Sequence, residues 1–438
     1  MSTWCKRLLS CNKMDQTKSM FSELPAGRPR EMLFSVLHQE NLIAVNVNYK
    51  INKSTASRWF SSLYTIEASS PTKNLNLYLK CLPEDGLKKE LLPCTLFFQN
   101  EVTFYNIVLP AYKELLGIKC PQGSILPISA PQCSAAEWNG KDDVVILKDM
   151  SISGFMILDR HTPMKLPEMC LVMKEIGRMH GYSLATKILW PEKMKEIKDN
   201  LVEPDFINPQ FEIFVRPVFY NNLEDIYTVM KKYYEEESIY LKKFHQFITK
   251  STDILLKLAK PDPTNEPYNV LIHGDLWINN FLFHYGEDKS EPDDICLLDF
   301  QHVRYNSPAI DLGRFLYATM DKTTRDKHRD YLLRCYHDNL CETLDQFGLC
   351  QEHLLPFSVL ENQLHKYSTF FIIISLLNIV HSLDDSEGEE KYIGDKLENI
   401  IQSVRKTQLR MNAVCRQRVF DVIEDFVERG YMDMSDSN

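Results

Sequence analysis

The chain has 438 residues, of which 44% are hydrophobic and 25% are charged. This length exceeds the usual size of one hydrophobic core, so we expect two domains or two lobes around a cleft. The composition is that of an ordinary globular protein, which argues against long disordered, fibrous or membrane-spanning regions. The formal net charge of -10 disfavours a general nucleic-acid binder, because phosphate backbones are held mainly by Lys and Arg.

The cysteines and the N-terminal residues bear on the cellular compartment in which the protein is expected to function. The 12 cysteines are scattered, without a CxxC pair or the spacing of a disulfide scaffold, so reduced thiols in the cytosol are the simplest interpretation. The first residues, MSTWCKRLLSCNKMDQ, lack the continuous apolar core of a secretory signal. The longest apolar run, Phe370 to Val380, is too short to span a bilayer and reads as a buried helix. We therefore expect a cytoplasmic protein without a membrane span.

The first structured part of the chain has the pattern of an antiparallel sheet. Between Ala44 and Lys80, apolar runs at Leu63–Ile66 and Leu75–Leu79 are separated by a Ser-Ser-Pro turn. A helix is expected next, over Leu96–Leu109, where apolar residues recur at helical spacing. Pro110 is expected to end this helix.

A short buried strand, Val144–Leu147, is followed by turn-forming residues between Asp149 and Gly154, and we place the boundary between the lobes at a hinge near Lys148 to Ser151. The remaining chain is mainly helical in period over Leu166–Ala185, Asn222–Ala259, Asp311–Phe347 and Glu361–Val380. This order predicts an α+β fold with two lobes. After a variable N-terminal segment of residues 1–30, a small antiparallel-sheet N-lobe would occupy residues 31–150 and a larger helical C-lobe residues 151–438.

One predicted hairpin interrupts the helices. Its strands, Asn280–Tyr285 and Ile295–Asp299, flank a polar loop, and the segment LIHGDLWINN before them is an apolar strand that runs into a second loop. This arrangement brings Asp275, Asn280 and Asp299 to one end of the hairpin. A carboxylate, an amide and a second carboxylate suit phosphoryl transfer, which needs a residue to orient the acceptor hydroxyl and oxygen ligands for Mg²⁺.

These motifs resemble the ecdysteroid kinase-like family of insects, within the aminoglycoside phosphotransferase and choline kinase superfamily. The resemblance covers most of the chain from about Ala44 to Val380, and the matching segments are HGDLWINN, LLDFQ, LYLKCLP, NEVTFYN and GRMHGYSLA. It implies a two-lobed protein-kinase-like fold, with a nucleotide-binding N-lobe and a C-lobe that holds the catalytic and acceptor-binding groups. It also implies ATP and Mg²⁺ as cofactors.

The resemblance assigns a role to each matching residue. Asp275 would be the catalytic base that accepts the proton of the acceptor hydroxyl, with Asn280 and Asp299 as ligands of Mg²⁺. Lys80 would contact the α- and β-phosphates of ATP, and Glu101 would fix its mobile ammonium group.

Further residues complete this interpretation. By resemblance, the hinge backbone around Asp149 and Met150 would meet adenine, and the Asp311 carboxylate would bind backbone of the catalytic loop. His273 has no second histidine at ligand spacing, so we expect a structural role. His180 is likewise expected to pack and form hydrogen bonds.

One stretch departs from the kinase-like pattern. Close approach of backbone to phosphates favours a residue without Cβ, yet the stretch Lys50–Ser57 contains no glycine. The small residues Ser54–Ser57 are expected to serve in place of glycine.

The favoured function is an ATP-dependent kinase that phosphorylates a hydroxyl group of a small molecule, by resemblance an ecdysteroid or a related steroid or xenobiotic alcohol. The short interval from Asp299 to Pro308 leaves no room for the activation segment of a protein kinase. Two alternatives stay open: a catalytically silent binding protein, motivated by the missing glycines, and a kinase for a cationic acceptor such as choline or an aminoglycoside, suggested by the acidic balance. A steroid would need an apolar wall. Its candidate aromatic residues, each of which could equally belong to the core, are Trp277, Tyr367, Phe370 and Phe371.

Overall fold

The computed structural model describes most of the chain, and the statements below concern those residues. They are residues 21–43, 46–54, 60–84, 86, 89, 92–119, 127–203, 206, 209–287, 290–349, 354–383, 398, 402, 405, 409 and 411–433.

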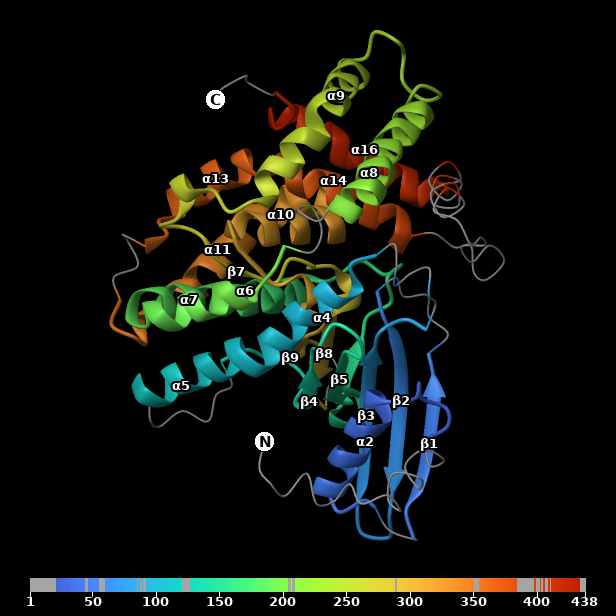
Figure 1. Cartoon of the computed structure of the whole chain (residues 1–438). Coiled ribbons are helices and arrows are strands. Elements are labelled where there is room, and N and C mark those ends of the chain that lie inside the picture. Colours follow the sequence, from blue (N-terminus) through green and yellow to red (C-terminus); the bar gives the residue numbers. More distant parts are fainter. Residues whose placement is uncertain are drawn as a thin grey trace.

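A five-stranded antiparallel sheet forms the smaller lobe, at the bottom of Figure 1. Its strand order is β1-β2-β3-β5-β4. The strands are β1 (Asn48–Lys53), β2 (Ser62–Ser69), β3 (Asn74–Cys81), β4 (Cys133–Glu137) and β5 (Val144–Lys148). The turn between β2 and β3 is closed by the Ser70 hydroxyl, which accepts from the Lys73 amide at 3.0 Å. The predicted strands and the turn between them are confirmed.

Two hydrophobic clusters divide the molecule into lobes. One joins helix α2 (Arg28–Gln39) to the inner face of the sheet, and the other holds the helical part of the chain. Strand β5 contributes to both, because side chains alternate along a strand: Val144 and Ile146 belong to the sheet cluster and Val145 to the helical one. The predicted two-lobed α+β fold is therefore confirmed.

The expected boundary at residue 30 falls inside α2. Phe21 and Leu24, which precede this helix, are buried in the same cluster as the sheet. We propose that the N-lobe includes these residues and that the helical lobe begins after Met150.

The predicted helix at Leu96–Leu109 exists, but Pro110 does not end it. Helix α4 (Cys94–Thr103) continues through a π-helical turn, η1 (Phe104–Val108), into α5 (Leu109–Lys119). In the π turn, the Leu109 amide donates to the Phe104 carbonyl, five residues earlier. A proline ring normally clashes with the carbonyl four residues before it and has no N–H to give. The wider turn relieves both problems, so the helix passes through Pro110.

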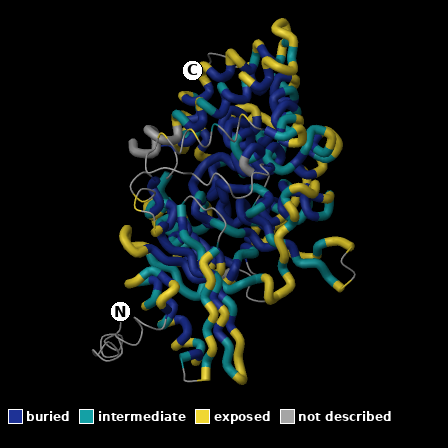
Figure 2. Tube along the Cα trace, turned by 90° about the vertical axis from the view of Figure 1, so that its right-hand side faces the viewer, coloured by how far each residue is buried: buried dark blue, intermediate teal, exposed yellow. Residues whose placement is uncertain are grey.

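The larger lobe consists of helices with short strands inserted near the sheet lobe (Figure 1). Its helices include α6 (Leu166–Leu189), α7 (Pro191–Asn200), α8 (Pro209–Met230), α9 (Ile239–Ala259), α10 (Pro308–Thr319), α11 (Lys322–Asp345), α13 (Phe357–Lys366), α14 (Ser368–Ser382) and α16 (Ala413–Glu428). Its strands are β6 (Phe155–Ile157), β7 (Val270–Ile272), β8 (Phe281–Tyr285), β9 (Pro292–Leu297) and β10 (Arg304–Asn306). Figure 2 shows that buried residues fill the interior of this lobe.

Helix α14 lies in that interior and pairs with α10. Tyr367, Phe370 and Phe371 are almost fully buried there. Gly313 on α10 permits the close approach, because a Cβ at that position would lie 2.2 Å from the Phe371 ring. These three aromatic residues therefore form core, and their alternative assignment to an acceptor wall is wrong. Trp277 is partly exposed.

Among the described helices, none is both long and apolar enough to cross a bilayer.

Candidate active site

The loop between β7 and β8 lies against the short helix η5 (Phe300–His302). Gly274 in this loop has φ +78°, and a Cβ there would lie 2.3 Å from the His302 carbonyl oxygen. Only glycine combines this backbone conformation with this close contact. On the other side, Arg304 of β10 pairs with Ile272 of β7, so the two segments that carry the predicted site residues are held together as one unit.

Asp311 holds the start of this loop. Its carboxylate accepts from the amide of His273 at 2.7 Å and from the amide of Gly274 at 2.8 Å. His180 contacts the same carboxylate at 3.2 Å and the Tyr336 hydroxyl at 2.9 Å. Burial alone would raise the pKa of Asp311, but the hydrogen bonds from His180 and from the Gly274 amide help to outweigh it, and the pKa is lowered. The expectations for Asp311 and His180 are confirmed.

His273 fastens the same loop to the end of the hairpin. Its Nε2 lies 3.0 Å from the Leu298 carbonyl, and its Nδ1 lies 3.3 Å from the Asp275 amide. Because a carbonyl can only accept and an amide can only donate, His273 is the neutral tautomer with its proton on Nε2. Burial lowers its pKa and favours this neutral form. His273 is structural, as predicted.

The structure brings Asp275 and Asn280 together. The Asn280 side-chain amide donates to the Asp275 carboxylate at 2.9 Å and to the Asp275 backbone carbonyl at 2.8 Å. The other carboxylate oxygen of Asp275 accepts from the guanidinium of Arg314, on α10. Asp275 is 7% exposed, so it is a largely buried carboxylate held on two sides.

Lys80 is the centre of a second cluster, which spans the two lobes. Its ammonium lies 2.6 Å from Glu101 of α4, 2.7 Å from Asp299 and 3.1 Å from the Gln301 side-chain oxygen. Burial favours neutral lysine, but the two carboxylates outweigh it and raise the pKa of Lys80. The Lys80–Glu101 pair expected from the sequence is therefore present as a buried ion pair, with Asp299 joined to it.

Asp299 takes an unusual backbone conformation. Its φ of +65° lies in the left-handed region, which costs energy for a residue with a Cβ. The predicted hairpin is confirmed as the antiparallel pair β8 and β9, and Asp299 follows two residues after β9. The left-handed turn between the strand and η5 leaves its carboxylate on the Lys80 side.

The two hinge residues lie at the end of β5. The Asp149 amide donates to the Asn76 carbonyl at 3.0 Å, and the Asp149 carboxylate accepts from the Ser151 amide at 2.8 Å. Met150 begins the short helix η2 (Met150–Ser153) and is partly exposed. The amide of Asp149 is thus already engaged in the sheet lobe. In the glycine-free stretch, only Lys50–Ser54 lies within the described residues.

A short strap, residues 200–203, connects α4 with the segment that carries Asp299. Asn100 of α4 exchanges two hydrogen bonds of 2.9 Å with Val202 and also donates to the Gln301 carbonyl at 3.3 Å. Both carboxylate oxygens of Glu203 accept from Arg304, at 2.7 and 2.6 Å. The strap is thus bonded to Asn100, which precedes Glu101, and to Arg304, on the segment that follows Asp299. It therefore holds Glu101 and Asp299 at fixed positions around Lys80.

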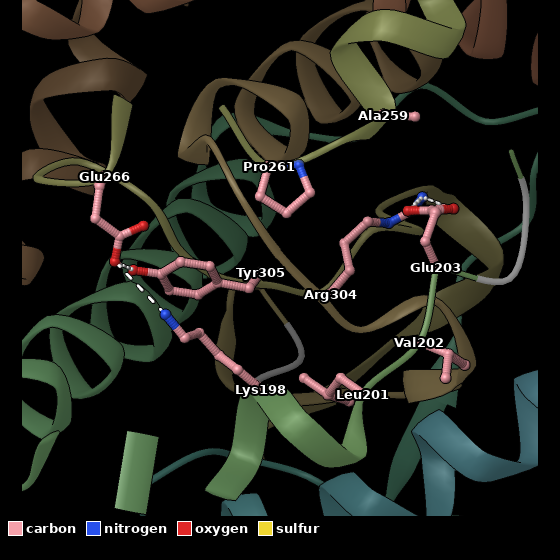
Figure 3. Close-up of a pocket in the computed structure, with 9 residues that line it drawn as sticks. All are labelled: Lys198, Leu201, Val202, Glu203, Ala259, Pro261, Glu266, Arg304 and Tyr305. Carbon is pink, nitrogen blue, oxygen red and sulfur yellow. Dashed lines mark hydrogen bonds and ion pairs between the residues drawn. The ribbon is translucent and has the colours of Figure 1, made fainter. Parts of the chain in front are cut away.

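A cavity of about 330 Å³ adjoins the strap. Figure 3 shows Arg304 facing Glu203 on one side of it, and Lys198, Tyr305 and Glu266 converging on the other. Its lining residues are Lys198, Leu201, Val202, Glu203, Ala259, Pro261, Glu266, Arg304 and Tyr305. Its charged groups neutralise one another.

We expect Glu203→Ala to lower the free energy of unfolding by about 3 kcal/mol, because it leaves the Arg304 guanidinium buried without its carboxylate. Urea unfolding measures this change. The control is Asp199→Ala, which breaks an exposed pair with Lys195 and should cost less than about 1 kcal/mol. Equal effects of the two substitutions would contradict a clamping role for the strap.

Sequence reasoning did not identify Arg314, Gln301 or Asn100. A signal existed for Arg314, since it is a charged residue within the otherwise apolar helix PAIDLGRFLYAT. Gln301 and Asn100 stand within the matching segments LLDFQ and NEVTFYN, but an amide side chain does not by itself indicate that it is buried. Their roles follow from contacts between segments about 200 residues apart.

The sequence matches one family model, described as the ecdysteroid kinase-like family, over residues 57–349. No curated protein matches it. Among solved structures, 58 chains match. One is an ethanolamine kinase from Plasmodium vivax, with 14% sequence identity, a TM-score of 0.39 and coverage of 92% of this chain and 95% of that chain. Another is an aminoglycoside phosphotransferase from Alicyclobacillus acidocaldarius, with 12% identity, a TM-score of 0.35 and coverage of 94% and 99%.

Proposed function

Because the chain belongs to the ecdysteroid kinase-like family, we propose that it is an ATP- and Mg²⁺-dependent kinase that phosphorylates a hydroxyl group of a small molecule. The observation that carries this proposal is the buried cluster of Lys80 with Glu101 and Asp299, joined through the His273–Leu298 contact to the loop that carries Asp275. Phosphoryl transfer depends on positioning and charge stabilisation, and this cluster supplies both signs of charge in fixed places.

In this function, Lys80 binds the α- and β-phosphates, and Glu101 orients its ammonium. In the structure, the carboxylates of Asp299 and Glu101 both contact the Lys80 ammonium. With Mg²⁺-ATP bound, Lys80 would hold the phosphates and the Asp299 carboxylate would hold the metal ion, so both charges of the present pair would keep a partner of opposite sign.

The residues present fit Mg²⁺. The nitrogen of the Asn280 amide is used by Asp275, which directs the amide oxygen away from that carboxylate. This oxygen and the Asp299 carboxylate are hard ligands of the kind that Mg²⁺ prefers. Among the described residues, no three His, Cys, Asp or Glu side chains converge as a metal site. Mg²⁺ would therefore take its remaining ligands from the phosphates and water, as is usual for nucleotide-bound Mg²⁺.

Asp275 is the base that takes the proton of the acceptor hydroxyl. One of its oxygens contacts Asn280 and the other Arg314, and each carboxylate oxygen has two lone-pair sites, so an acceptor hydroxyl can still bind. Adenine would lie at the hinge, where Met150 and the carbonyl of Asp149 are the remaining backbone contacts, since the Asp149 amide is engaged by Asn76.

For the acceptor, we propose an ecdysteroid or a related steroid or xenobiotic alcohol, on the strength of the family. The partly exposed Trp277, two residues after Asp275, is the remaining aromatic candidate for its binding site. A protein acceptor is disfavoured, because η5 and β10 fill the interval between Asp299 and Pro308. We also propose a cytoplasmic location, since the described cysteines are free thiols.

The test is a competition assay with saturating Mg²⁺-ATP, in which an ecdysteroid, choline and an aminoglycoside compete and products are identified by the mass of an added phosphoryl group. We expect the ecdysteroid to be phosphorylated, and the Asp275→Asn variant, prepared in the same way, to form only a trace of the product, which excludes a contaminating kinase. Phosphorylation of only the cations would replace the steroid with a cationic acceptor. If none reacts and Mg²⁺-ATP does not bind, the silent binding protein is the better description.

A further inference from the structure

Arg314 lies directly behind the proposed base. It is on α10, 7% exposed, and its two terminal nitrogens reach the same loop: one donates to the Asp275 carboxylate and the other to the Gly274 carbonyl at 2.6 Å. The guanidinium is planar, so two bonds from one plane fix both the loop backbone and the side chain of Asp275.

The position of Arg314 is itself rigid. Helix α10 packs against α14 through Gly313 and Phe371, and Asp311 on the same helix binds the loop amides of His273 and Gly274. One helix thus supplies an acceptor for the amides of the loop and a donor for its carbonyl and for Asp275.

Arg314 also supplies a positive charge next to the Asp275 carboxylate. The loop His273–Asn280 contains no Lys or Arg, and His273 is neutral. Asp275 would otherwise face the anionic phosphates of ATP as an uncompensated carboxylate. Like charges repel more strongly in a buried site than in water, and a guanidinium in contact with one of them reduces that repulsion.

We propose that Arg314 is a positioning residue for phosphoryl transfer, which fixes the Asp275 carboxylate and offsets its charge as the transferring phosphoryl group approaches. This inference rests on the proposed kinase function. Arg314 acts through Asp275 and does not bind the metal or the adenine. Its removal should therefore lower the rate of the chemical step and leave the KM for ATP nearly unchanged.

The experiment compares Arg314→Met and Arg314→Lys with the parent protein. Single-turnover ADP formation from Mg²⁺-ATP is measured, with water as the acceptor and with the alcohol that the competition assay identifies. We expect a loss of about 100-fold for Arg314→Met, within the range that one charged donor contributes to catalysis. Arg314→Lys keeps the charge but not the planar pair of bonds, so we expect a loss of about tenfold.

A matched control separates catalysis from folding. Arg329 has the same exposed fraction of 7% and donates two bonds to Glu361, away from the catalytic loop. Arg329→Met should lower the Tm without lowering the single-turnover rate. A loss of rate in Arg329→Met equal to that in Arg314→Met would make the effect a general result of removing a buried arginine, and the proposal would fail.

A double-mutant cycle tests whether Arg314 acts through Asp275. In an Asp275→Asn background, Arg314→Met should cause no further loss of residual turnover, whereas an independent role would give multiplied losses. Multiplied losses, or a parent-like rate for Arg314→Met, would overturn the inference while leaving the kinase function in place. A parent protein that forms no ADP would overturn both.

Discussion

Replacing Asp275 with Asn is expected to reduce kcat by about 1,000-fold, the scale of a lost general base. The substitution keeps the shape of the side chain but removes its ability to take the proton of the acceptor hydroxyl. Because Lys80, Glu101 and Asp299 are untouched, affinity for Mg²⁺-ATP should stay within about twofold by titration calorimetry.

The structure adds a second expectation for this variant. Asp275 accepts from Arg314 on one oxygen and from Asn280 on the other, so an amide at position 275 must present its nitrogen to one of these two donors. The variant should therefore have a lower Tm than the parent, while still binding nucleotide. A variant that keeps near-parental kcat would remove Asp275 from the role of base.

Replacing Asp299 with Ala is expected to weaken Mg²⁺-ATP binding by about 100-fold at limiting Mg²⁺, because a carboxylate ligand of the metal is lost. High Mg²⁺ should restore part of the affinity. Titration of nucleotide at several Mg²⁺ concentrations measures this dependence, and an unchanged affinity at limiting Mg²⁺ would exclude Asp299 as a ligand.

A matched variant distinguishes the loss of a metal ligand from the loss of a carboxylate next to Lys80. Asp299 also contacts Lys80 at 2.7 Å, so Asp299→Ala removes one of the two carboxylates around that ammonium. Glu101→Gln removes the other carboxylate and no proposed metal ligand. It should weaken nucleotide binding equally at every Mg²⁺ concentration. If both variants show the same Mg²⁺ dependence, the effect of Asp299 passes through Lys80 alone.

Local pattern was sufficient to predict the elements around the site. Strands β2 and β3, the hairpin of β8 and β9 and the order of the two lobes follow from alternation, helical period and turn residues, which act within a few positions of the chain. The segment HGDLWINN and the later Asp299 also mark the hairpin end where Asp275 and Asn280 meet. The spacing of these residues along the chain is set by a loop and a short antiparallel hairpin. Their approach to one another therefore depends little on the rest of the molecule.

Contacts between distant segments decided the remainder. Pro110 is a helix breaker by local rules, yet the chain passes through it because a π turn moves the carbonyl that its ring would meet. An apolar residue such as Phe371 suits both a hydrophobic core and the wall of a ligand site. Only the close approach of Gly313 shows that Phe371 belongs to the core.

The surroundings of the base depended most on tertiary structure. Arg314 follows Asp275 by 39 residues, and Arg304 and Glu203 are 101 residues apart, yet each pair is joined by charged hydrogen bonds. The periodicity of the sequence indicates which face of a helix or strand is buried. It does not indicate which two buried charged residues will form a pair. That choice is made when helices and strands pack, because a buried charge is stable only where folding brings its partner within reach.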